Sequence, residues 1–166
     1  LGTRITAFLI SDLLTQEPDF LEIVERDRLS RILQEQKLQS SGLITGDKAK
    51  EIGNLVGADY LLVGKVISGE VNRDRSEDIL TKDEEDVIKI RVEKEVYVEV
   101  IFKLLNVSNG SVKISKSFEE VETYRESYFE DEPEVITSDE KLLNDALKEV
   151  AARFANVLVR EYSLAQ

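Results

Sequence analysis

The sequence contains no cysteine and no histidine. Without cysteine there are no disulfide bonds, thiolate nucleophiles or cysteine-containing zinc sites, although either an oxidising or a reducing compartment remains compatible. Without histidine there is no Ser-His-Asp triad and no imidazole acid–base catalysis. We therefore expect a protein that is not an enzyme, with no catalytic residues, no metal ligands and no cofactor.

Methionine is also absent, and the chain opens on Leu1. We expect a fragment or processed form, with a signal peptide, a lipid-accepting cysteine or a first strand lying upstream. The 166 residues fit one domain with its own core. No apolar run reaches the roughly 20 residues that a membrane-spanning helix needs.

Positive charge is scarce, since 22 lysines and arginines face 34 acidic residues and the net charge is −12. Proteins that bind nucleic acids or anionic membrane surfaces present clustered lysine and arginine. We therefore expect neither partner.

In the first half of the chain, apolar residues recur at helical spacing over residues 4–15, and Pro18 ends that helix. Residues 20–24 read as a short strand, residues 28–37 and 47–56 as helices, and residues 60–67 as an apolar strand covered on both faces. Helices between two buried strands predict a parallel pairing with a right-handed crossover.

The second half begins with residues 72–86, which are charged and lack periodicity, so we expect a mobile excursion. Residues 87–105 then alternate strictly between apolar and polar, which predicts a long half-buried strand. Lys94 is the one charge on the apolar parity and suggests a bend or break there. Asn109-Gly110 predicts a hairpin turn into a return strand that starts near Val112.

Residues 119–140 are the most acidic stretch, and three aromatic residues lie within them. We expect residues 119–137 to form a second charged excursion. Thr137 and Glu140 have capping-box spacing and predict the start of a long closing helix. The expected fold is a single α/β (α+β) domain in which helices flank a mixed β-sheet.

Two stretches, VERDRLSRILQEQKLQSSGL and IGNLVGADYLLVGKV, resemble the curli production assembly/transport family of CsgG-type domains. The family's motif positions are matched by Arg26, Leu29, Leu33, Glu35, Gln36, Gly53, Gly57, Ala58, Asp59, Tyr60 and Gly64. The resemblance covers most of the chain. It implies a fold similar to the amino-terminal domain of TolB and of lipoprotein activators of penicillin-binding proteins, with the family's first strand preceding Leu1.

The resemblance also implies a bacterial envelope protein that works by binding other proteins. Channel members of the family build their pore from two inserted hairpins, which by chain order would correspond to residues 72–86 and 119–137. Neither segment shows the outward apolar alternation of a membrane hairpin. We therefore expect no direct membrane insertion and a periplasmic location, with outer-membrane anchoring through an upstream lipid.

The expected function is a non-enzymatic interaction or assembly module whose partners are other envelope proteins or a second copy of itself. One alternative is a subunit of an oligomeric outer-membrane secretion complex. Another is a ligand-binding or hydrolytic protein on the same scaffold, since fold does not fix function.

Candidate contact residues are Tyr124, Tyr128 and Phe129, because aromatic residues in polar segments are typical of protein-contact hot spots. Covering the end of the sheet or the closing helix is the competing interpretation. The motif residues Arg26, Asp27, Leu29, Glu35, Gly57, Ala58, Asp59 and Gly64 read as structural: Asp27 as a helix cap, and residues 57–59 as a tight turn rather than a ligand cradle. The acids at 83–86 and 130–134 lack the EF-hand register and read as a solvated face rather than a calcium site.

Overall fold

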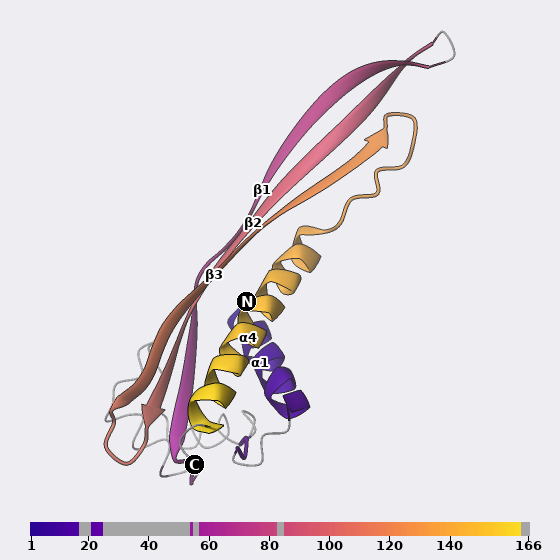
Figure 1. Cartoon of the computed structure of the whole chain (residues 1–166). Coiled ribbons are helices and arrows are strands. Elements are labelled where there is room, and N and C mark those ends of the chain that lie inside the picture. Colours follow the sequence, from indigo (N-terminus) through magenta and orange to yellow (C-terminus); the bar gives the residue numbers. More distant parts are fainter. Residues whose placement is uncertain (17–20, 25–53, 55–56, 83–84, 164–166) are drawn as a thin grey trace, which may run out of the picture.

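The computed structural model describes residues 1–16, 21–24, 54, 57–82 and 85–163. It contains helix α1 (Gly2–Gln16), strands β1 (Tyr60–Lys82), β2 (Glu85–Asn106) and β3 (Val112–Phe129), and helix α4 (Asp139–Ser163) (Figure 1). The three strands form one antiparallel sheet in the order β1-β2-β3. The expected class, a single α/β domain with helices against a sheet, is confirmed.

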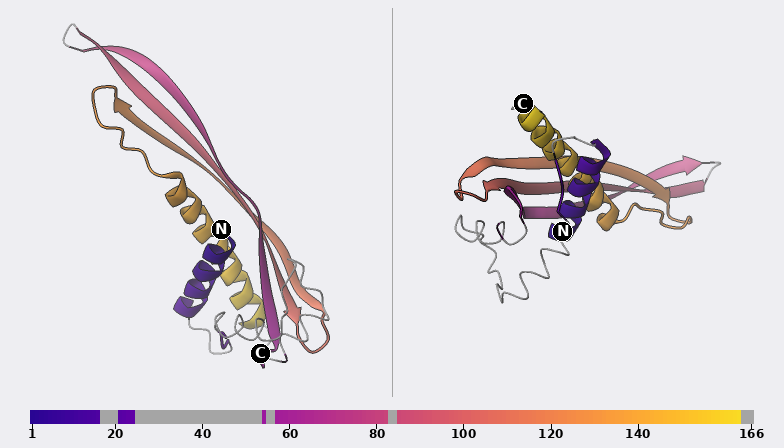
Figure 2. Two further views of the ribbon diagram at one scale, coloured as in Figure 1. Left: turned by 180° about the vertical axis from the view of Figure 1, so that it is seen from behind. Right: turned by 90° about the horizontal axis from the view of Figure 1, so that it is seen from below.

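The sheet is much longer than the helices that cover it. β1 has 23 residues, which at about 3.3 Å per residue gives a length of roughly 75 Å. Figure 2 shows α1 and α4 together on one side of the sheet, and β1 and β2 run on well past them. We call the part under the helices the body (residues 60–71, 96–106 and 112–122). The projecting part is the arm (residues 72–82, 85–95 and 123–129).

The body holds the hydrophobic core, which lies between the helices and one face of the sheet, here called the inner face. Alternate residues of β2 point into it, as the sequence predicted, and they are buried together with residues of both helices: Val96, Val98, Val100, Phe102, Leu104, Ile5, Leu9, Leu13, Leu142, Ala146, Leu147, Val150, Ala151, Phe154, Ala155 and Leu158. Two β3 residues, Ile114 and Phe118, complete this core.

Three phenylalanines join the sheet to α4. The rings of Phe102 and Phe154 stack with centroids 4.2 Å apart, and Phe118 meets both of them edge to face. Gly64 lies opposite Phe102 in the ladder, and a Cβ at this position would stand 3.2 Å from the Phe102 ring. A glycine in β1 therefore leaves the space that the stacked ring occupies.

A β-bulge between Val66 and Ser68 changes the parity of β1. Leu62 and Val66 pack against the core before the bulge, and Val71 does so after it. The extra residue thus returns β1 to the correct face as the strand leaves the body.

The expected parallel pairing is wrong for the described residues. Residues 21–24 have no regular secondary structure, although Ile23 packs against the core, and β1 pairs antiparallel with β2. The strand expected at residues 60–67 is present, but the expected cover on both faces is wrong, since only Leu61 is buried and Ile67 is 44% exposed. An apolar run is compatible with either direction of pairing, and the hairpin supplies the nearer partner. The predicted helices at 28–37 and 47–56 lie outside the described residues, apart from a helical Asn54.

The two excursions were also predicted wrongly. Residues 72–82 continue β1 in unbroken register with β2, and residues 119–129 belong to β3. Within the second excursion, which was expected over residues 119–137, residues 130–137 lack helix and strand. Both faces of the arm carry charged residues, so β1 and β3 show no alternation there, while the backbone ladder from the body continues.

The start of α4 differs from the prediction by one residue. The Ser138 hydroxyl accepts a hydrogen bond from the Lys141 amide at 3.2 Å, which makes Ser138 the N-cap in place of Thr137. Asp139 and Glu140 occupy the first turn, where carboxylates stabilise the free amides.

We expect Phe154→Ala to lower the free energy of unfolding by about 3–5 kcal/mol, because it removes a fully buried ring that two other rings contact. Chemical denaturation followed by circular dichroism measures this loss. Val135→Ala, at a side chain that is 81% exposed, is the control and should change stability little. Equal effects of the two substitutions would contradict the assignment of the core.

Candidate interaction surface

The arm presents its own inner face, continuous with that of the body. The register places Arg73, Lys94 and Tyr124 in one row across the three strands, and the next row toward the tip contains Arg75, Val92 and Glu126. Ile90 and Val92 are 3% and 2% exposed, although both helices lie over the body. Another segment must therefore cover them.

The segment that runs along this part of the sheet is residues 130–138, which we call the strap. It leaves the end of β3 and returns to the start of α4 along the arm (Figure 1). The Glu130 amide donates to the Ile88 carbonyl at 3.0 Å, the last backbone bond of the ladder on this side. From there the strap is attached by side chains to all three strands.

Lys94 of β2 makes the central attachment. Its side chain is only 6% exposed, and Nζ donates to the Thr137 carbonyl oxygen at 2.6 Å and to Asp139 Oδ1 at 2.5 Å. The expected break at this lysine is wrong, because β2 continues through it without interruption and without a register shift. A buried ammonium group is tolerated when a carboxylate and a carbonyl compensate it, and here both come from the strap and the first turn of α4.

Glu126 of β3 makes the second attachment. Its carboxylate accepts from the Thr137 amide at 2.9 Å and from the Thr137 hydroxyl at 2.5 Å. The hydroxyl bond, the largest cause, lowers the pKa of Glu126 below its usual value. Because the pKa is lowered on folding, this stabilisation is present above the usual carboxyl pKa and is lost as the pH falls through the lowered one.

Arg73 of β1 makes the third attachment, with Nη2 2.8 Å from Glu134 Oε1. This ion pair is about half exposed and is individually weak. Together the three attachments take the strap across the inner face from β1 to β3. Arg73 and Lys94 belong to one row of the sheet, and Glu126 belongs to the next row, which also contains Val92.

The three aromatic candidates do not form one cluster. Tyr124 and Tyr128 pair with Lys94 and Ile90 on the inner face, whereas Phe129 pairs with Lys89 on the opposite face. All three are half-buried, and Tyr124 also packs against the core. Tyr124 donates its hydroxyl proton to Glu122, and this hydrogen bond, followed by burial, raises the pKa of Tyr124 to about 12.

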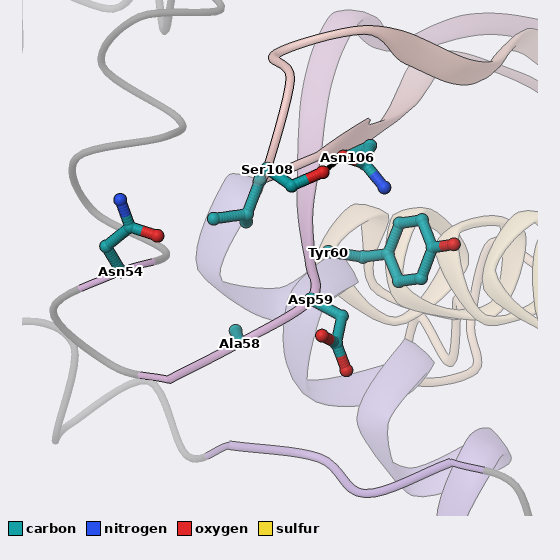
Figure 3. A pocket seen from close by; sticks show the side chains of 7 residues that line it. Asn54, Ala58, Asp59, Tyr60, Asn106 and Ser108 are labelled. Atoms are coloured by element: carbon teal, nitrogen blue, oxygen red, sulfur yellow. Dashed lines mark hydrogen bonds between the residues drawn. The ribbon is translucent and has the colours of Figure 1, made fainter.

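Residues 57–59 lie at the other end of the sheet. Gly57 has φ 71°, in the left-handed region that favours glycine, and the Asp59 carbonyl accepts from the Val107 amide at 2.9 Å. A hollow of about 380 Å³ opens beside them, lined by Asn54, Ala58, Asp59, Tyr60, Asn106, Val107 and Ser108. Figure 3 shows the Asp59 carboxylate pointing away from Asn106 and Ser108. The polar groups do not converge on a common point, which favours a turn over a ligand cradle.

Of the remaining motif residues, Gly64 lies in β1 opposite Phe102, and Arg26, Asp27, Leu29 and Glu35 lie outside the described residues. Within the described ranges, no group of three or more acidic side chains is arranged to hold a metal ion. None of the helices in this part of the chain has the length and apolar character needed to cross a membrane.

Sequence reasoning missed the strap attachments, and it missed Lys94 as their centre. A signal was present, because a lysine on the buried parity of an apolar strand requires a buried acceptor. The identity of that acceptor was not readable, since Asp139 lies 45 positions away along the chain.

We expect Glu122→Gln to lower the pKa of Tyr124 toward the ordinary tyrosine value, because the substitution removes the carboxylate that accepts the phenol proton. Spectrophotometric titration follows the formation of tyrosinate as the pH rises. The step of the titration curve that is missing in Tyr124→Phe is the one that belongs to Tyr124. Glu93→Gln, on the opposite face beside Arg125, is the control and should leave it unchanged. If the Tyr124 step stayed at the same pH in Glu122→Gln, the assigned hydrogen bond between Tyr124 and Glu122 would be contradicted.

Comparison with known proteins identifies a family for this chain. No curated protein matches the chain significantly. The model of one family, described as "Curli production assembly/transport component CsgG", matches residues 1–160. That match supports, at a coarse level, an assembly- or transport-like function in the cell envelope. The chain therefore belongs to the CsgG family of curli production assembly/transport components.

Proposed function

We propose that this protein is a non-enzymatic assembly module of the bacterial envelope that binds other proteins through its arm. The observation that carries the proposal is the projection of a three-stranded sheet beyond the helices that would cover it (Figure 1). A sheet that leaves its own core buries less apolar surface per residue than one packed under helices. Such an extension is typical of a sheet whose edges and faces are covered by a binding partner.

The edges of the arm support this function. In the described part of the chain, no strand pairs with the outer edge of β1 or of β3. Exposed strand edges are templates for pairing with another chain, and soluble proteins ordinarily shorten or cover them. Ile79 and Leu80, near the tip, add exposed apolar surface, 72% and 42% exposed respectively.

The compartment we propose is the periplasm, with attachment to the outer membrane through a lipid upstream of Leu1. The partners we propose are other envelope proteins or a second copy of this chain. The charge of −12 supports protein partners over nucleic acids. The many carboxylates do not by themselves favour a hydrolase, because acids are abundant everywhere in this sequence.

A second candidate function is that of a subunit in an oligomeric outer-membrane secretion complex. The two edges of the arm favour it, because the β1 edge of one copy and the β3 edge of the next could form a head-to-tail contact. Light scattering separates a monomer from a closed ring.

Photo-crosslinking in cells tests the role of the arm. With the full protein carrying a crosslinking amino acid at Ile79, we expect a defined crosslink to one envelope protein or to a second copy. The matched control is Leu14 on α1, which is also exposed and should give little product. Equal crosslinking from both positions, or none from Ile79, would argue against the arm as the contact surface.

The double variant Tyr128→Ala/Phe129→Ala tests the aromatic residues separately. Fewer crosslinks from Ile79 with an unchanged denaturation midpoint would support a contact role for the two rings. A lowered midpoint would assign them instead to covering the end of the sheet.

A further inference from the structure

We propose that the strap is a displaceable occupant of the inner face of the arm, and that this face is a docking site for an extended acidic segment of a partner protein. The inference deepens the proposed function and rests on it, since it names the surface and the chemistry of the segment that the surface receives.

The way the strap is held favours displacement. Among the described residues no ladder bond follows that of the Glu130 amide, although Glu132 bonds to the Phe129 backbone in a turn, and residues 130–135 are exposed. The attachments to the other rows of the sheet are made at Glu134, Thr137 and Asp139, each through a side chain of the sheet, and the ion pair of Glu134 is half exposed. Segments with few buried contacts and no ladder open more readily than the core beside them.

The surface under the strap has a defined chemistry. Arg73 and Lys94 present two cationic groups, and Glu126 in the next row presents an acceptor. Val92, beside Glu126, and Ile90, one row nearer the tip, form an apolar floor. Lys94 is almost fully buried, so a segment that replaces the strap has to supply oxygen acceptors to its ammonium group. If the strap moved away and nothing replaced it, the apolar side chains of Ile90 and Val92 would be exposed to water. This favours replacement of the strap by another segment over simple opening.

The contacts of the strap define which side chains a partner segment needs in order to bind the same surface. Glu134 reaches Arg73, Thr137 supplies a carbonyl to Lys94 and two donors to Glu126, and Asp139 completes the shell of Lys94. Ile136 lies between these groups and is half-buried. The partner segment is therefore extended, with carboxylates on both sides of an apolar and a hydroxyl residue.

Opening need not disturb the body. The core around Phe102 and Phe154 is formed by body residues and both helices, and the strap contributes none of its members. Glu134→Gln removes the ion pair with Arg73, and Thr137→Ala removes the hydroxyl bond to Glu126. The bonds that the Thr137 amide and carbonyl make to Glu126 and Lys94 remain, so the double substitution loosens the strap and leaves the residues beneath it in place. This loosened variant is the form in which the surface can be tested.

The probe is a fluorescent peptide with the sequence of residues 130–139, EDEPEVITSD, added to the full chain. In the native protein the tethered strap competes at a high effective concentration, so we expect binding to the loosened variant to be on the order of tenfold tighter. Asp131→Asn, at an exposed strap residue, is the control and should bind as weakly as the native protein. A peptide carrying Glu134→Gln, Thr137→Ala and Asp139→Asn should not bind.

Lys94 decides whether the peptide occupies the proposed surface. Adding Lys94→Met to the loosened variant should abolish binding, whereas Lys113→Met, at an exposed lysine, should not affect it. If Lys94→Met fails to fold, Arg73→Gln in the same background replaces it and should weaken binding. Equal binding to the native and loosened proteins, or binding that neither Lys94 nor Arg73 affects, would overturn the proposal. Peptide binding without crosslinks from Ile79 would place the failure in the proposed function instead.

Discussion

The ammonium group of Lys94 lies where the body of the sheet meets the arm, and several other features depend on it. A lysine that is 6% exposed in the middle of an apolar strand requires acceptors within reach. The Thr137 carbonyl and the Asp139 carboxylate provide them, and they come from the end of the strap and the first turn of α4. One buried charge therefore fixes where the closing helix begins and where the strap crosses the sheet.

The residue at which α4 begins also determines which of its side chains face the core. With Ser138 as the N-cap, the buried face of the helix presents Phe154 to the ring of Phe102. The β-bulge in β1 and the space beside Gly64 adapt the edge strand to the same packing. The body is thus a compact unit formed by two helices and one face of three strands, and it leaves the other half of the sheet to project.

The projecting half of the sheet, the arm, is the part of the chain on which our functional proposal rests. Membership of the CsgG family supports an assembly- or transport-like function in the envelope. We propose the arm as the part that serves this broad function: no strand pairs with its edges in the described part of the chain, and Ile79 and Leu80 near its tip are exposed. Its inner face is covered by a segment of the same chain that is held by side chains rather than by a ladder. In our proposal the body is the scaffold and the arm is the part that binds the partner.

The sequence by itself determined the elements whose pattern reflects burial on one side. The strict alternation of residues 87–105 predicted β2, Asn109-Gly110 predicted the turn where Gly110 has φ 69°, and the apolar stripes predicted α1 and α4. The resemblance to the family came from the motif between Arg26 and Gly64, which the family match supports. What only the tertiary structure decided was the pairing: residues 72–82 form a strand because β2 offers a ladder, not because their own side chains alternate. The same holds for the acceptors of Lys94. The sequence indicates that a lysine on the buried face of a strand needs an acceptor, but only the folded chain brings Asp139, 45 positions away, close enough to supply one.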